Sequence, residues 1–124
     1  MGTALVETLL KARSGEVPVP ELLRRLVGSD LVVPSGQPVA ADGAGLQPLL
    51  YDRDGVPMVA CFADRAGARS VATLAPHALR IRGGDLLRRI PAGHGLVVNP
   101  GLDAWFDLSP EGVARAIEAF VDPP

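Results

Sequence analysis

Two β-compatible runs joined by a turn that contains Asp-Gly constrain the fold of this sequence more than any other feature. The runs are residues 49–51 and 56–62, and the turn is formed by residues 52–55. Asp-Gly between two such runs is a strong signal for a β-hairpin. Because a hairpin alone is only marginally stable, the sequence predicts a sheet with helices packed on it.

Helical patterns flank the hairpin on both sides. Apolar residues at helical spacing, preceded by capping residues or by Pro in the first turn, predict the longer helices. These helices cover residues 4–12, 20–27, 86–90 and 110–121. A shorter helix is expected over residues 66–71 behind a capping Asp64, and a further helical segment of one or two turns is expected after Pro76.

Short apolar runs bounded by turn residues predict the remaining strands, at residues 31–33, 96–98 and 105–108. Pro100 and Gly101 suit the central positions of a type II turn after the second of these runs. The sequence therefore predicts a single domain over residues 1–124, of the α/β class (α+β). We expect a single mixed or antiparallel sheet of about four to five short strands, flanked by N- and C-terminal helices.

Composition and charge limit the classes of partner. Hydrophobic residues make up 48% of the chain and charged residues 21%, as in a folded globular protein. Because 12 Lys and Arg stand against 14 Asp and Glu, no basic excess is left to neutralise phosphates, and nucleic acid is not an expected partner. No apolar run reaches the roughly 18 residues of a membrane span. We therefore expect no membrane insertion.

The single cysteine and the first residues of the chain bear on the compartment. Cys61 is the only cysteine, so no disulfide can form within the chain. Residues 1–10 have no basic segment before their apolar residues, which argues against a signal peptide. Both features fit a cytoplasmic location.

No set of residues in the sequence has the spacing of a known reactive centre. A thiol nucleophile would need Cys61 beside His77 or His94, but Cys61 lies in an apolar strand run, where burial suppresses thiolate formation. Two histidines and one cysteine show no metal-ligand spacing. We therefore expect no enzyme activity, no metal and no cofactor.

Four residues are candidates for contact with a partner. Trp105 and Phe106 are adjacent on a predicted strand, so one should face the core and the other the opposite side of the sheet, where an aromatic ring can anchor a partner. His94 lies between two glycines that expose it, and Asn99 ends a strand. The loops at residues 35–48 and 92–95 supply adaptable surface.

The C-terminal half carries a more specific pattern, and parts of the N-terminal half extend it. The residues concerned are Gly84, Asp85, Leu86, Leu87, Ile90, Pro91, Gly93, Gly95, residues 96–101, Phe106 and Leu108, together with Val33, Pro34, the hairpin and residues 59–66. With them, roughly residues 5–121 resemble the N-terminal domain of the SseB family, the enhanced-serine-sensitivity type. The chain has Ala63 where Thr is common in the family, and it is expected to lack the second domain of the longer members.

The resemblance implies a mixed α/β domain without established catalytic residues. It also implies a bacterial protein with an accessory role beside a secretion system, the type VII system included. The favoured interpretation is a non-catalytic protein-interaction module that binds a protein partner or a second copy of itself. The alternative is a small-molecule binding protein or a hydrolase that uses Asp64, His94 or Asp103 in a cleft near the strand ends.

Overall fold

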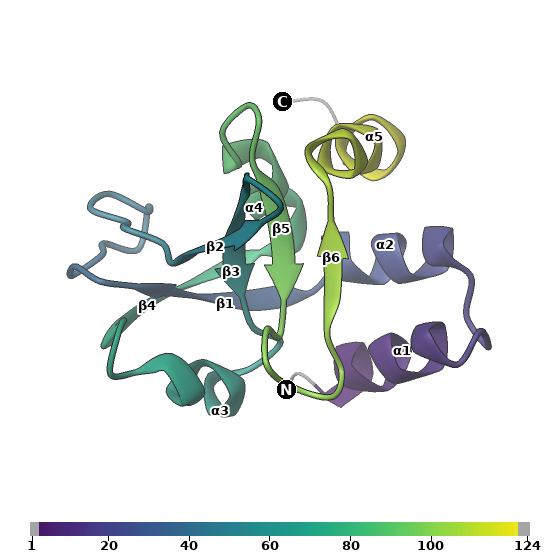
Figure 1. Cartoon of the computed structure of the whole chain (residues 1–124), viewed down its shortest axis with the longest axis horizontal. Coiled ribbons are helices and arrows are strands. Elements are labelled where there is room, and N and C mark those ends of the chain that lie inside the picture. Colours follow the sequence, from purple (N-terminus) through teal and green to yellow (C-terminus); the bar gives the residue numbers. More distant parts are fainter. Residues whose placement is uncertain (1–2, 122–124) are drawn as a thin grey trace.

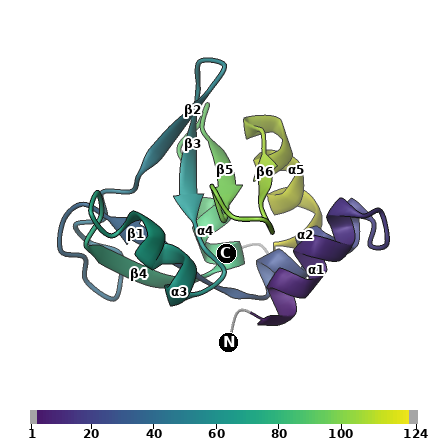
Figure 2. The same cartoon turned by 60° about the horizontal axis from the view of Figure 1, so that its bottom comes forward.

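The predicted hairpin is present in the computed structural model, which describes residues 3–121. Strand β2 (Leu50–Arg53) pairs antiparallel with β3 (Val56–Cys61). Asp54 and Gly55 form the turn with φ angles of 52° and 88°. Two positive φ angles in a two-residue turn are typical of type I′, whose twist matches that of the paired strands. The hairpin tip projects away from the other elements in Figure 2.

The hairpin is half of a four-stranded mixed sheet with the order β2-β3-β5-β6. Strand β5 (Gly95–Val98) pairs parallel with β3, and β6 (Phe106–Leu108) pairs antiparallel with β5. The crossover from β3 to β5 runs through all the elements between them, as a parallel connection requires.

A second, two-stranded sheet lies beside the first. It consists of β1 (Asp30–Ser35) and β4 (His77–Arg82), which pair antiparallel. An isolated bridge between Val32 and Phe62 joins β1 to the end of β3, and Figure 1 shows the pair extending to the left of the larger sheet.

The helices pack around one apolar core. The long ones are α1 (Thr3–Arg13), α2 (Val19–Val27), α4 (Gly83–Arg89) and α5 (Pro110–Phe120), and the short ones are α3 (Arg65–Ala68) and the 3₁₀ turn η1 (Arg69–Val71). Leucines of α1, α2 and α4 meet one face of the four-stranded sheet, together with Val113 and Ala116 of α5. No helix among the described residues is long and apolar enough to cross a membrane.

The predicted fold class is confirmed: the chain is a mixed α+β domain with helices at both ends of the described region. The helical segment predicted after Pro76 is wrong, because this stretch is strand β4. Leu79 is buried and Ile81 half-buried, while Ala78, Arg80 and Arg82 between and beside them are exposed. This alternation is typical of a strand with one buried face, and β4 pairs with β1 along its whole length. The chain therefore has a two-stranded sheet beside the four-stranded one, where a single sheet of about four to five strands was expected.

Candidate functional site

The four-stranded sheet has a second face, here called the outer face, which carries Met58, Ala60 and Val97. Leu49 and Val56 pack against these three side chains. This cluster contains no helical residue among those described, whereas the other face is covered by four helices. The buried apolar cluster of the outer face is therefore formed by side chains from the sheet and its loops.

Trp105 lies on this side of the sheet, in the loop just before the edge strand β6 and close to Arg13 at the end of α1. Its ring lies 4.7 Å from the Arg13 guanidinium and 5.7 Å from that of Arg53, measured to the ring centroid. A cavity of about 440 Å³ opens beside it, with Met58 and Val97 as the floor. The remaining lining residues are Tyr51, Asp52, Arg53, Pro100, Gly101, Leu102 and Asp107.

An ion pair crosses the outer face. Arg53 of β2 reaches Asp107 of β6, the strand at the opposite edge of the sheet. The pair separates the Trp105 cavity from a smaller one of about 130 Å³, which Arg53 and Asp107 also line. The two charged side chains thus lie beside the apolar side chain of Met58, which lines both cavities.

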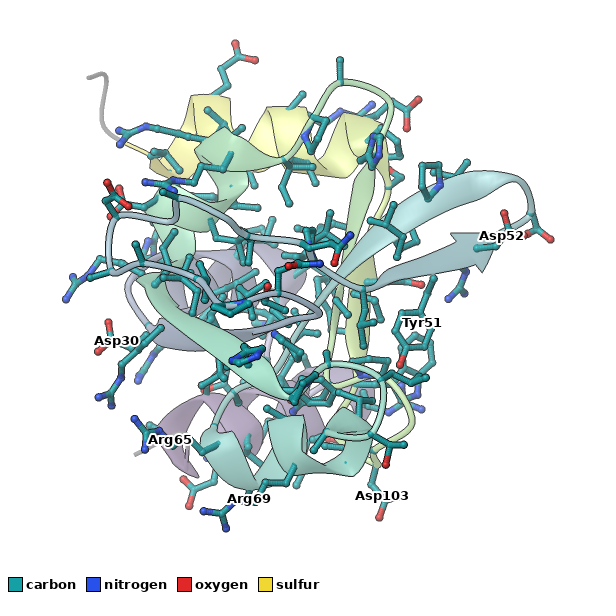
Figure 3. All side chains as sticks on the ribbon, turned by 90° about the vertical axis from the view of Figure 1, so that its left-hand side faces the viewer. Asp30, Tyr51, Asp52, Arg65, Arg69 and Asp103 are labelled. Carbon is teal, nitrogen blue, oxygen red and sulfur yellow. The ribbon has the colours of Figure 1, made fainter. Side chains whose placement is uncertain are left out.

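Strand β2 forms an edge of the sheet, and all four of its residues are exposed. Leu50 is 53% exposed and Tyr51 is 37% exposed. Ala60 N–H donates to Leu49 O at 3.0 Å, so the backbone groups of alternate residues, Leu50 and Asp52, point away from β3. Figure 3 shows Tyr51 and Asp52 on this hairpin, at the side of the molecule. The outer face is continuous with this free edge through Tyr51.

The two adjacent aromatic residues point to opposite sides of the sheet, as their spacing predicts. Trp105 lines the outer-face cavity, and Phe106 packs against the main core on the helical side. Only Trp105 is therefore placed to meet a partner on the outer face.

Asn99 is buried, and its side chain joins two backbone segments. It is 3% exposed, and its side-chain oxygen accepts from Ala63 N–H while its amide nitrogen donates to Ala104 O, both at 2.9 Å. The predicted type II turn follows it, with Leu102 N–H donating to Asn99 O and Gly101 at a φ of 81°. Because both ends of its amide are bonded within the chain, Asn99 positions the Trp105 loop.

His94 lies in the turn between α4 and β5, with Nδ1 3.3 Å from Ala92 O. Asp64 and Asp103 lie beyond the other ends of β3 and β5. Asp64 is already engaged as the cap of α3, since its Oδ1 accepts from Gly67 N–H at 2.7 Å. Asp103 is exposed in the loop before β6. Strand β5 thus separates His94 from both carboxylates of the hydrolase alternative.

Cys61 is fully enclosed in the core. Its exposed fraction is zero, and burial raises the pKa of its thiol far above the ordinary value. A neutral, enclosed thiol is a poor nucleophile.

This raised pKa predicts a loss of stability in alkali. Above pH about 8.5 the unfolded chain releases the thiol proton while the folded chain keeps it, so the free energy of unfolding falls by up to about 1.4 kcal/mol per pH unit. Urea unfolding at a series of alkaline pH values measures this slope. Cys61→Ala, which removes the ionisable group, should show a shallower decline, and equal slopes for both proteins would contradict the assignment.

Sequence reasoning missed the neighbours of Trp105. Tyr51, Arg53 and Met58 share a face because they occupy alternate and paired positions in the hairpin register. The shared face of these three residues can be predicted from the hairpin alone. Their meeting with Val97 and Asp107 also depends on the strand order, which no local pattern specifies.

The family comparison gives one finding. The model described as "SseB protein N-terminal domain" matches residues 5–115, which is nearly the whole chain. The chain belongs to the SseB N-terminal domain family. Neither the curated proteins nor the solved structures include a match to this SseB domain. The matched range contains the outer face, the Trp105 loop and the hairpin.

Proposed function

We propose that this SseB domain is a non-catalytic protein-interaction module that binds its partner on the outer face, with Trp105 as the anchor. The observation that carries the proposal is the position of Trp105, beside an open cavity with an apolar floor on the face opposite the main helical core. With it we propose an accessory role in the bacterial cytoplasm beside a secretion system, which rests on the family resemblance.

The side chains around the cavity suit protein contact. Trp, Tyr and Arg contribute most of the binding energy in known interfaces, and Trp105, Tyr51 and Arg53 lie together here. The two arginines near Trp105 keep its ring oriented in the free protein through cation–π contacts. A ring held in place before binding loses little conformational entropy when a partner arrives.

The free edge of β2 suggests how the partner approaches. Its outward backbone groups at Leu50 and Asp52 can pair with an extended segment, as in complexes formed by strand addition. Side chains of such a segment that point to the outer face would reach the cavity past Tyr51. An apolar side chain next to Trp105 is the expected contact, because Met58 and Val97 form the cavity floor.

Capture of a partner from the native cytoplasm, compared between wild type and Trp105→Ala, tests the proposal. Loss of the anchor is expected to weaken binding by about 2 kcal/mol, which is roughly 30-fold in Kd. Leu74→Ala is the matched control because Leu74 is an apolar residue that is 69% exposed and does not line the cavity. A protein retained by wild type and by Leu74→Ala, and lost with Trp105→Ala, supports the module.

The chain offers a direct readout, since Trp105 is its only tryptophan. Titration of the captured protein should shift the Trp105 emission to the blue as water leaves the ring. An unchanged emission with saturable binding would place the partner elsewhere and overturn the proposed face.

A mass by light scattering that rises with concentration and is lowered by Trp105→Ala would identify a second copy as the partner. Turnover of a small substrate by the purified chain would favour the enzyme alternative and contradict the module.

A further inference from the structure

A second surface on the molecule collects arginines around a groove that shares no residue with the outer-face cavity. The groove lies between the segment α3–η1 and the β1–β4 pair. It consists of two adjoining cavities of about 500 Å³ and 280 Å³, which have Val32, Arg65 and Arg80 in common. We call it the basic groove.

Arginines line both sides of the groove. Arg65 and Arg69 come from α3 and η1, Arg80 comes from β4, and the carboxylates of Asp30 and Asp64 line the inner cavity. Arg80 is 4.0 Å from Asp30. Arg65 and Arg69 form no ion pair with any residue between 3 and 121. Figure 3 shows both side chains on the same side of the molecule, below Asp30.

The groove contrasts with the charge of the whole chain. The net charge is −2, so an anionic partner is repelled by the molecule overall and attracted only where cations gather. Several other arginines are already paired, as Arg24 and Arg25 are with Glu21 and Arg88 is with Asp85. Arg65 and Arg69 differ from these arginines because they bring to one groove two guanidinium groups without an ion pair to any described residue.

The spacing of the two arginines indicates the form of the anion. Arg65 and Arg69 are four positions apart in a helical segment, so their Cβ atoms are about 6 Å apart on one side of it. Alternate residues of an extended chain are about 6.6 Å apart and also point the same way. Two carboxylates at alternate positions of an extended peptide would therefore meet both guanidinium groups, each as a bidentate pair.

The rest of the lining leaves room for small side chains and does not suit the stacking of a nucleobase. It is mostly alanine and proline, with Pro34, Ala68, Ala72, Ala75, Pro76 and Ala78 in the outer cavity. Among the residues that the structure describes, no Phe, Tyr or Trp lines either cavity, whereas nucleotide and single-strand sites stack bases on such rings. We propose that the basic groove binds an extended acidic segment of a protein partner, with carboxylates at alternate positions separated by small residues.

Fluorescence anisotropy with a labelled peptide of alternating Glu and Ala tests this inference. We expect saturable binding that weakens as salt is raised, because the contacts are exposed charges. A peptide of the same composition with all the Glu at one end should bind more weakly. Arg65→Glu with Arg69→Glu should weaken binding of the alternating peptide by at least about tenfold, and Lys at both positions should retain part of it.

Arg82→Glu with Arg115→Glu is the matched control, since it changes the net charge equally at two exposed residues outside the groove. Equal loss in this control would show general charge attraction and overturn the inference, as would equal binding of both peptides or no binding. Displacement by inorganic phosphate or ATP more readily than by unlabelled peptide would assign the groove to a small anion instead. Trp105→Ala should leave peptide binding unchanged. The peptide experiment therefore tests the basic groove independently of partner binding on the outer face.

Discussion

Gly83→Ala is expected to lower the free energy of unfolding by about 3 kcal/mol, near the upper end of the range for overpacked sites. Gly83 begins α4 where this helix meets α2, and Gly83 N–H donates to Ser29 O at 2.7 Å. A Cβ atom at this position would overlap the Leu26 carbonyl oxygen and lie 2.8 Å from its carbon. These are backbone atoms of a packed helix, so they cannot rotate away as a side chain would.

Urea unfolding of Gly83→Ala against Gly28→Ala measures this effect. Gly28 ends α2 with a φ of −87°, and a Cβ there would be 3.7 Å from its nearest neighbour, an ordinary contact. Gly28→Ala should therefore stay within about 0.5 kcal/mol of wild type. If the two variants unfold at the same urea concentration, α2 and α4 do not approach as closely as described.

Local chemistry made much of the fold predictable. The Asp-Gly turn, the Ser109 cap with Pro110, and the Asp64 cap are satisfied by neighbours a few residues away. Ser109 Oγ, for example, accepts from Gly112 N–H at 3.0 Å. Such interactions need no knowledge of the tertiary structure, so the sequence alone specifies them.

Strand β4 could not be predicted in the same way. Its hydrogen-bonding partner is β1, and the register pairs Leu79 with Val33 across more than forty positions of sequence. Pro76 before a short polar and apolar stretch is compatible with a helix start as well as with a strand. The choice between them is made by β1, which without β4 would leave its backbone groups unpaired beside the core.

The outer face illustrates the same limit for the candidate site. Trp105 could be named from the sequence because two adjacent aromatics must diverge on a strand. The ion pair between Arg53 and Asp107 could not, because it joins the two edge strands of the sheet and depends on the order between them. The sequence makes Asn99 a candidate for contact with a partner, but its burial depends on how the β5–β6 loop folds back over the end of β3.

Asn99→Ala is expected to destabilise the domain by about 3 kcal/mol. The variant leaves Ala63 N–H and Ala104 O without their side-chain partners, and buried groups left unpaired cost about 1–3 kcal/mol each. Asn99 also has a φ of 56°, a conformation that Asn tolerates better than Ala. Urea unfolding followed by circular dichroism measures the total effect.

Asn99→Gly separates the two causes, because Gly accepts the positive φ but supplies no amide. We expect it to be more stable than Asn99→Ala by about 1 kcal/mol, and still less stable than wild type. Since Ala104 immediately precedes Trp105, loss of its hydrogen bond should also loosen the indole and shift its native emission to the red. A variant as stable as wild type, with unchanged emission, would mean that the Asn99 amide does not hold the Trp105 loop, and the anchor would then have to be positioned by Arg13 and Arg53 alone.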